Sequence, residues 1–512
     1  MRHRAMIVSV LLVLAAAAAA TLPAAAADSR NSAAVSAVIQ VTGGVADFQV
    51  LPRDNNDRAA AHMLGRCYPT EGAIEARLCD RGAPMPDLDW RQVGAASDGK
   101  WTADLRKLPV GGPYDLEVRL VSADGEPLAT TAMRSVLVGD LWILAGQSNM
   151  QGVGLISELP PPIAAVSMFA MDDRWALGRE PLHPLLESVD EVHWQVPKEK
   201  TREEVLPGFR QGVRAREARG VGPGLPFAWE LYRLTGVPIG LIPCAHGGTS
   251  LQQWSPERKD EGGRSLYGAM IRRAAAAGGK IRGVLWYQGE SDANPDAAGT
   301  YQQRFTDFVA AARRDLGEPD LCFLYVQIGR FIVPADGLAA AWDRVREAQR
   351  LAEAQLGRAA VVPALDGTLI DLIHLDTAAQ MTVGRRLALQ AAREVFGREA
   401  IRRGPRLAEV TIDSSRRVVT LRFAEVNRAL RAEGRPLGFS LDDGTGADIP
   451  AIVRTDLPAE RPDTIELRLA RELPEGARLW YGRGLDPCVN VTDEQNLGML
   501  AFGPVPIPFP AE

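Results

Sequence analysis

Between about residues 141 and 397, short apolar runs alternate with longer amphipathic stretches, and no other feature of the sequence constrains the fold as much. The apolar runs are too short for helices and predict buried strands at Leu141–Ala145, Val237–Pro243, Ile281–Tyr287, Leu321–Gln327 and Ala359–Leu365. The stretches between them predict helices at Phe227–Leu234, Ser265–Ala277, Tyr301–Leu316 and Leu338–Leu356. Strands that alternate with helices predict an α/β domain with a mainly parallel sheet.

Residues whose side chains could take part in catalysis follow four of these five strand candidates. In open parallel sheets the working site lies at the carboxyl ends of the strands, so this placement matters. The residues concerned are Gln147 to Asn149, residues 244–250 (Cys-Ala-His-Gly-Gly-Thr-Ser), residues 288–292 (Gln-Gly-Glu-Ser-Asp), and the loop that holds Asp371 and His374. The sequence therefore predicts one composite site at this edge of the sheet.

Ser148 is the candidate nucleophile. It stands in a turn directly after a buried strand that breaks at Gly146, and the glycines that bound the turn, Gly152 and Gly154, leave its surroundings open. The turn differs from the G-x-S-x-G elbow of α/β-hydrolases because Met150 occupies the place of the second glycine. A serine in such a turn is also an ordinary turn residue, so the motif predicts a nucleophile only together with the residues below.

Asp371 and His374 form the strongest local pair. Thr377 to Gln380 fit a capping box that opens a helix ending near Phe396, which places His374 in the loop before a helix N-terminus. In a turn, the spacing of three lets the carboxylate accept a hydrogen bond from imidazole Nδ1–H while Nε2 faces the cleft. A nucleophilic serine needs such a base, held in one tautomer by a third group.

Other residues compete for these two roles. His246 also follows a strand and is an alternative base, although no carboxylate stands three residues before it. His183 and His193 lie in a Pro- and charge-rich insertion at 155–225 and are interpreted as surface residues or substrate contacts. The alternative orienting carboxylates are Asp366, Asp376 and Asp292.

A serine nucleophile also needs preorganised donors for the oxyanion. Gly247 and Gly248 offer backbone N–H groups, since glycine allows close approach of the main chain to a ligand. Gln288 offers a side-chain amide, which the rest of its loop is expected to aim. The residues expected to support these loops and the nucleophile turn are Gln147, Asn149, Glu290 and Asp292.

Two β-rich regions flank the α/β domain, which is expected over residues 139–402. Short runs between glycine-rich turns predict a β-sandwich-like domain at 28–138, and similar runs predict a second β domain at 403–512. Residues 1–27 have the pattern of a signal peptide, because Arg2 and Arg4 precede an apolar stretch that ends in small residues. This pattern predicts a secreted or periplasmic protein, with an uncleaved membrane anchor as the alternative.

Composition argues against several other classes of protein. The net charge is −6 with no dense basic block, so nucleic acid is not an expected partner. No later stretch approaches the roughly 20 apolar residues of a transmembrane helix. Cys67 and Cys79 are candidates for a disulfide, Cys244 and Cys322 are expected as buried thiols, and Cys488 is left over. An odd count without a C-x-x-C motif argues against a structural zinc site.

The ordered blocks resemble SGNH-type carbohydrate esterases, most closely the sialic acid-specific 9-O-acetylesterase and acetylxylan esterase group. The resemblance extends over nearly all of the chain that follows the signal segment. The residues that carry it are Gly146-Gln147-Ser148-Asn149-Met150, residues 242–250 (Ile-Pro-Cys-Ala-His-Gly-Gly-Thr-Ser), residues 286–292 (Trp-Tyr-Gln-Gly-Glu-Ser-Asp) and Asp371-x-x-His374.

The resemblance implies a three-layer α/β/α hydrolase domain of flavodoxin-like type, flanked by β domains. It implies a catalytic triad of Ser148, His374 and Asp371, with no metal ion and no organic cofactor. The wider superfamily has Asn as its side-chain oxyanion donor, whereas Gln288 stands in that place here, as in this esterase group. The implied oxyanion donors are the Ser148 backbone N–H, an N–H of Gly247 or Gly248, and the amide of Gln288.

We therefore expect an exported serine esterase that removes O-acetyl groups from a carbohydrate through an acetyl-enzyme on Ser148. One alternative is a non-catalytic carbohydrate-binding protein on a relict hydrolase scaffold, and another is a lipid or thioester hydrolase of the same fold. The sugar is left open between sialic acid and plant polysaccharides such as xylan, and the oligomeric state is left open too. The arginines that the sequence offers to a substrate carboxylate are Arg210, Arg214 and Arg216.

Overall fold

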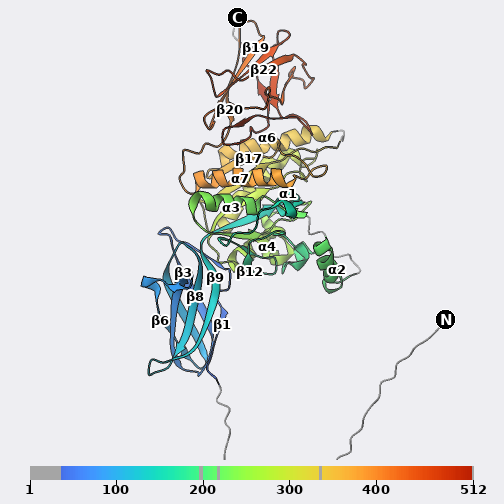
Figure 1. Ribbon diagram of the computed structural model, residues 1–512. Coiled ribbons are helices and arrows are strands. Elements are labelled where there is room, and N and C mark those ends of the chain that lie inside the picture. The colour runs from blue at the N-terminus through green and yellow to red at the C-terminus, as the bar shows by residue number, and fades with distance from the viewer. Residues whose placement is uncertain (1–35, 195–199, 216–218, 334–336, 510–512) are drawn as a thin grey trace, which may run out of the picture.

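The computed structural model describes residues 36–194, 200–215, 219–333 and 337–509. Figure 1 shows a blue N-terminal β domain, a central domain with the long helices, and a red C-terminal β domain, following one another along the molecule. The signal peptide predicted at 1–27 lies outside the described residues. Within the described part of the chain, no helix is long and apolar enough to cross a membrane.

One long strand, β9 (Pro127–Gly146), runs from the N-terminal domain into the central domain. The sequence predicts a strand at Leu141–Ala145 and a separate β domain that ends at residue 138, but in the structure this boundary falls inside one continuous strand. The first part of β9 pairs with β8 and β2, and the second part pairs with β14 and β15. The bounds of these neighbours are Gly111–Val121 (β8), Val50–Pro52 (β2), Ile239–Pro243 (β14) and Ile281–Tyr287 (β15).

The rest of the N-terminal domain is antiparallel, with the strand order β1-β3-β7-β6-β4-β8 leading to β9. Alternate residues of β3 and β7 are buried, as expected for strands with one face on a core. Its remaining strands are β1 (Val38–Gly43), β3 (Arg58–Tyr68), β4 (Gly72–Asp80), β5 (Ala83–Pro84), β6 (Arg91–Ser97) and β7 (Lys100–Pro109).

The central sheet has the order β12-β11-β14-β9-β15-β16-β17, and its neighbours are parallel except for β12 against β11. The chain passes from β14 on one side of β9 to β15 on the other, so the strand order reverses at β9. Ligands of open α/β sheets bind at such a reversal, outside the carboxyl ends. The other strands are β11 (Val166–Phe169), β12 (Trp175–Leu177), β16 (Cys322–Gln327) and β17 (Ala359–Pro363).

Helices connect successive strands of this sheet. The four helices that were predicted between strands are confirmed, and the bounds of α6 agree to the residue. Helices α3 and α7 pack against each other, as do α5 and α6. The bounds are α1 (Ser148–Gln151), α2 (Arg202–Ala215), α3 (Gly224–Thr235), α4 (Leu266–Ala276), α5 (Tyr301–Asp315), α6 (Leu338–Leu356) and α7 (Thr377–Glu394). Short elements of the central domain include β10 (Gly154–Leu155), β13 (Arg219–Val221), η4 (Glu191–His193) and η6 (Ala298–Thr300).

The predicted capping box at the start of α7 is wrong. Asp376 is the N-cap, and its carboxylate accepts a hydrogen bond from the N–H of Ala379 at 2.8 Å. The hydroxyl of Thr377 instead bonds to the backbone of Leu155. The local pattern allowed either cap, and the nearby strand β10 provides the better partner for Thr377.

Cys67 and Cys79, the candidates for a disulfide, do not pair, because both residues carry free thiols. Cys79 is buried in the N-terminal domain, whereas Cys67 lies on β3 opposite Ile39 of β1. The expectation of buried thiols at Cys244 and Cys322 is confirmed, and burial raises the pKa of both.

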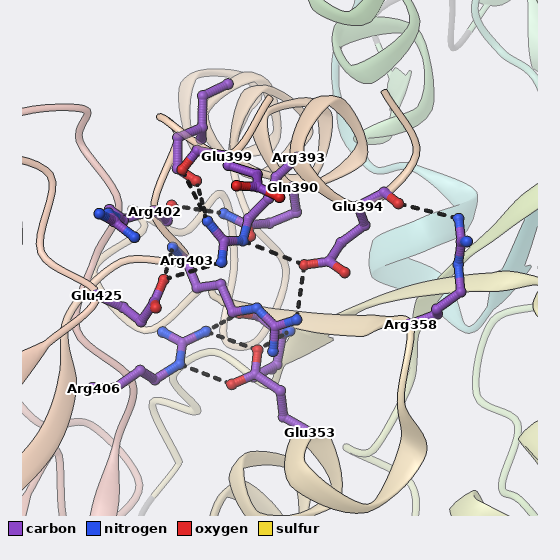
Figure 2. Close-up of polar contacts among 12 residues, drawn as sticks. Glu353, Arg358, Gln390, Arg393, Glu394, Glu399, Arg402, Arg403, Arg406 and Glu425 are labelled. Carbon is purple, nitrogen blue, oxygen red and sulfur yellow. Dashed lines mark hydrogen bonds and ion pairs between the residues drawn. The ribbon is translucent and has the colours of Figure 1, made fainter. Parts of the chain in front are cut away.

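The C-terminal domain is built from a four-stranded, a three-stranded and a two-stranded sheet around its own core. Its strands are β18 (Arg406–Ile412), β19 (Val418–Ala424), β20 (Leu430–Arg431), β21 (Phe439–Asp442), β22 (Ile452–Asp456), β23 (Thr464–Leu469), β24 (Arg478–Tyr481), β25 (Thr492–Asp493) and β26 (Phe502–Pro506). A network of ion pairs, drawn in Figure 2, joins helices α6 and α7 to the chain entering this domain. In it, Arg406 makes a bidentate pair with Glu353, and Arg403 pairs with Glu394.

Candidate active site

The structure brings Ser148, His374 and Asp371 together at the carboxyl edge of the sheet. Ser148 is the first residue of α1, directly beyond the end of β9. His374 Nε2 lies 2.9 Å from the Ser148 hydroxyl oxygen, and Asp371 accepts a hydrogen bond from His374 Nδ1–H at 2.9 Å. With Nδ1 protonated, Nε2 is an acceptor for the serine proton. The arrangement is that of a nucleophile, its base and the group that orients the base.

The turn at Gly146 places Ser148 at this edge. Gly146 has φ 130° and packs so closely against β15 that a Cβ would lie 2.1 Å from the carbonyl oxygen of Tyr287. Only glycine fits such a position, so the chain leaves the strand there and starts α1. Ser148 itself is partly exposed while its neighbours on either side are buried.

The electrostatics of Asp371 favour its charged form. Partial burial alone would raise the pKa of this carboxyl group, but three hydrogen bonds outweigh it and hold the pKa below its usual value. They come from the His374 ring and from the backbone N–H groups of Ile373 and His374. An ionised Asp371 can stabilise a positive charge on the ring of His374.

The alternative acids and bases have other partners. His246 Nδ1 lies 3.2 Å from His193 Nδ1, and the two rings stack. Asp366 pairs with Arg386, and Asp376 caps α7. Of these candidate bases, His374 is the one that the structure places against Ser148.

His183 and His193 are not surface residues as the sequence suggested, because both are buried. The insertion folds back over the edge of the sheet, so that His183 Nδ1 lies 3.1 Å from the backbone oxygen of Gln151. Burial lowers the pKa of His183 to about 3, and it lowers the pKa of His193 as well. Both rings are therefore neutral packing groups, His183 against the turn that carries Ser148 and His193 against His246.

Asn149, next to the nucleophile, ties two catalytic loops to α1. Its amide donates to the Glu290 carboxylate at 2.9 Å, and its side-chain oxygen accepts from the N–H of Leu375 at 3.0 Å. Gln380 on α7 donates to its backbone oxygen. Glu290 is buried, and burial raises its pKa. Gln147 makes a second tie, because its side-chain oxygen accepts weakly from backbone N–H groups of residues 289 and 291.

The chain also matches a known protein family. A family model of carbohydrate esterases, described as sialic acid-specific acetylesterases, matches residues 138–393, which is half of the chain. The chain belongs to this family. The matched segment holds the turn that carries Ser148 (the nucleophile turn), the loop that carries Gly247 and Gly248 (the glycine loop) and the Asp371–His374 loop.

Individual relatives agree with this assignment. The esterase is 32% identical over 274 residues to a probable carbohydrate esterase of Arabidopsis thaliana, covering 88% of that protein and 48% of this chain. It is 30% identical over 251 residues to the human sialate O-acetylesterase, covering 45% of that protein and 44% of this chain. The match thus spans less than half of the human protein. Relatives with these names are carboxylic ester hydrolases, and the chain is an enzyme of this class.

A solved structure shares the fold over almost the whole molecule. The crystal structure of a carbohydrate acetylesterase from Xanthomonas citri covers 91% of this chain and 99% of its own, with a TM-score of 0.61 at 24% identity. The flanking β domains are therefore part of an arrangement that occurs elsewhere.

The amide of Gln288 is occupied in the esterase. Gln288 is fully buried, and its NH₂ group donates to the backbone oxygen of Thr249 at 3.1 Å and to the Asp292 carboxylate at 2.6 Å. Neither amide hydrogen is left for an oxyanion in this arrangement, contrary to what the sequence suggested. Gln288 instead fixes the loop that follows β14, and Asp292 also accepts from the N–H of Leu251.

Sequence reasoning missed Gln151, which controls the glycine loop. Its side-chain oxygen accepts a hydrogen bond from the N–H of Gly247 at 2.8 Å. Gln151 lies three residues after Ser148 on α1, a spacing that puts both side chains on one face of a helix and was the available signal. A Cβ on Gly247 would lie 3.4 Å from the Ser148 Cβ, so the tether holds this loop against the nucleophile.

Gly248 presents a different environment. It is exposed, has φ 72°, and a Cβ there would meet nothing within 4 Å. Its backbone therefore borders open space beside the nucleophile turn. Arg219 on β13 borders the same site, with Nη1 4.0 Å from Asp371 Oδ2 and a side chain that is 51% exposed. Arg216 lies outside the described residues, as do the side chains of Arg210 and Arg214.

Proposed function

We propose that the esterase removes O-acetyl groups from a carbohydrate through a covalent acetyl-enzyme on Ser148. The observation that carries the proposal is the hydrogen-bonded chain Ser148–His374–Asp371 at the strand-order reversal. Family membership supports O-deacetylation of carbohydrates as the overall reaction. We also infer a three-layer α/β/α arrangement of SGNH type, which the packing of α3 on α7 and of α5 on α6 supports.

The reaction has two halves. The Ser148 oxygen attacks the acetyl carbonyl carbon while His374 Nε2 takes the hydroxyl proton, and Asp371 stabilises the imidazolium. The tetrahedral intermediate collapses, the sugar oxygen leaves with the proton from His374, and the acetyl group stays on Ser148. Water then attacks the acetyl-enzyme with His374 as base, and acetate leaves.

The oxyanion donors that we assign are the backbone N–H groups of Ser148 and Gly248. The N–H of Ser148 opens α1, where the first amides of a helix have no partner within it. Gly248 borders open space, whereas the N–H of Gly247 is used by Gln151. In this proposal Gln288 and Asp292 keep the loop in place rather than contacting substrate.

Gln151 is expected to act as a positioning residue. Gln151→Met keeps the length of the side chain but removes the oxygen that accepts the Gly247 N–H. We expect kcat for a small acetyl ester to fall by about 10-fold with little change in KM, since one poorly placed oxyanion donor affects mainly the transition state. The thermal midpoint serves as the control, and an unchanged kcat would contradict the role.

Arg219 is expected to favour acidic sugars. Its half-exposed guanidinium lies beside Asp371, within reach of a substrate carboxylate. Arg219→Ala should lower kcat/KM for O-acetylated sialosides by about 10-fold, the effect of losing one charge-assisted hydrogen bond, and should affect acetylated xylan much less. An equal loss on both substrates would mean that Arg219 acts through Asp371 instead.

Two alternative functions can be distinguished from the proposed one by experiment. A relict binding protein would not react with a serine-directed phosphonate, whereas the proposed enzyme is labelled at Ser148. A lipid or thioester hydrolase would turn over an octanoyl ester faster than an acetyl ester. The proposed export rests on the pattern of residues 1–27, and N-terminal sequencing of the protein from its native cells tests it by locating the cleavage site.

A further inference from the structure

A cavity of about 740 Å³ lies between the central domain and the C-terminal domain, away from the residues of the triad. Residues of η6, α5 and α6 form one wall, and residues of β21, β24 and β26 form the other. Figure 1 shows α6 on the side of the central domain that faces the red strands. A cavity of this size is typical of sites for small ligands. We call it the α6 cavity.

The charges around the α6 cavity balance. Three arginines, at 344, 478 and 483, stand against three carboxylates, at 343, 347 and 442. Arg478 and Arg483 are paired with acids of their own domain, at 2.8 and 2.6 Å. The lining thus offers many hydrogen-bonding groups without a net charge, which suits a neutral polar ligand better than a phosphate or a polyacid.

The lining of this cavity combines polar groups that have unused hydrogen-bonding capacity with apolar surface. Arg344 and Gln302 have no hydrogen-bond or ion-pair partner among the described residues. Asp343 uses only one carboxylate oxygen, toward the N–H of Gly484 and, at 3.7 Å, toward Arg346. The apolar part of the lining includes Leu351, which is 41% exposed, and Ala340. A sugar has the same two-sided character, with C–H faces and hydroxyl edges.

Part of the lining of the α6 cavity lies at the edge of the sheet that carries Ser148. Helices α5 and α6 each follow a parallel strand, so their first turns lie at the carboxyl edge. The backbone continues from the cavity toward the triad: the N–H of Phe331 donates to Leu485, next to Gly484, and the N–H of Ile332 donates to Leu372. Leu372 is 56% exposed and lies next to Asp371, and Ile332 is 42% exposed.

We propose that the α6 cavity is a second binding site, for an uncharged oligosaccharide segment of the polymer whose acetyl group is removed at Ser148. The proposal rests on the esterase function proposed above. The acetylated residue reacts at Ser148 while neighbouring residues of the same chain cross the apolar surface of Leu372 and Ile332 to the cavity. The ion pairs of Figure 2 hold the C-terminal domain against α6, so the cavity needs little rearrangement to bind.

A matched pair of substitutions on one helix tests the proposal. Ala340 lines the cavity, whereas Ala354 is exposed on α6 and does not line it. Ala340→Trp places an indole in part of the cavity and should raise KM for acetylated xylan about fivefold or more, with hydrolysis of 4-nitrophenyl acetate unchanged. Ala354→Trp should leave both substrates unchanged. Equal kinetics of the two variants on acetylated xylan would overturn the proposal.

Binding without hydrolysis separates this proposal from the proposed function. Affinity electrophoresis in chemically deacetylated xylan or galactoglucomannan should retard the wild-type protein, and Arg344→Ala should weaken the retardation severalfold. Retardation by neither polymer, or by sialylated mucin alone, would overturn the proposal. If the wild-type protein releases no acetate from any substrate, the esterase function fails, and the retardation experiment still decides the α6 cavity by itself.

Discussion

Replacing Ser148 by alanine is expected to lower kcat for a small acetyl ester by about 10⁴-fold or more while the fold survives. The reason is chemical: without the hydroxyl, no acetyl-enzyme forms, and the His374–Asp371 pair can only assist water. The side chain of Ser148 is partly exposed and its oxygen contacts His374, so its removal leaves no buried cavity. Acetate release and the circular dichroism spectrum measure the two parts of this prediction.

The control for this experiment is Ser250→Ala. Ser250 belongs to the loop that carries Gly247 and Gly248, but its hydroxyl faces Gln253. Its removal should change kcat less than about threefold, as is usual for a substitution outside the catalytic machinery. Substantial turnover by Ser148→Ala would contradict the assignment of Ser148 as the nucleophile. Loss of activity in both variants would indicate a disturbance of the loop that carries Gly247 and Gly248.

Local sequence patterns were enough to predict most strands and helices of the central domain. Helix α6 was predicted to the residue because it contains no glycine or proline and is bounded by Gly337 and Gly357. The fused strand β9 was missed, since Gly139 and Asp140 look like a turn in the sequence. In the structure Asp140 is paired with Arg53 and Arg282, which makes a buried carboxylate compatible with a strand.

The site was predicted where the chemistry is local and missed where it depends on packing. Asp371 and His374 are three residues apart, so their contact follows from a turn. The role of Gln288 depends on packing, because its amide donates hydrogen bonds to Asp292 and to a backbone oxygen of another loop. The buried His183 and His193 lie in the insertion, whose path over the sheet no local pattern specifies.

Among the substitutions considered, the largest loss of stability is expected from breaking the ion-pair network at the junction with the C-terminal domain. Arg406 and Glu353 are 16% and 11% exposed, and they form two parallel hydrogen bonds at 2.9 and 3.0 Å. Burial alone would raise the pKa of Glu353, but Arg406 outweighs burial and lowers it. The stabilisation is therefore present at neutral pH and is lost as the pH falls through the lowered pKa of Glu353.

Glu353→Ala is expected to lower the free energy of unfolding by about 3–5 kcal/mol, because it leaves the guanidinium of Arg406 buried without its counter-ion. The exposed pair Arg422–Glu409, at 2.9 Å, is the matched control, and Glu409→Ala should cost less than about 1 kcal/mol. Urea unfolding of both variants measures the difference. The double variant Glu353→Leu/Arg406→Leu should recover much of the loss, since it removes both charges together. Equal stabilities of Glu353→Ala and Glu409→Ala would show that water reaches Arg406, and that the C-terminal domain is held by its other contacts.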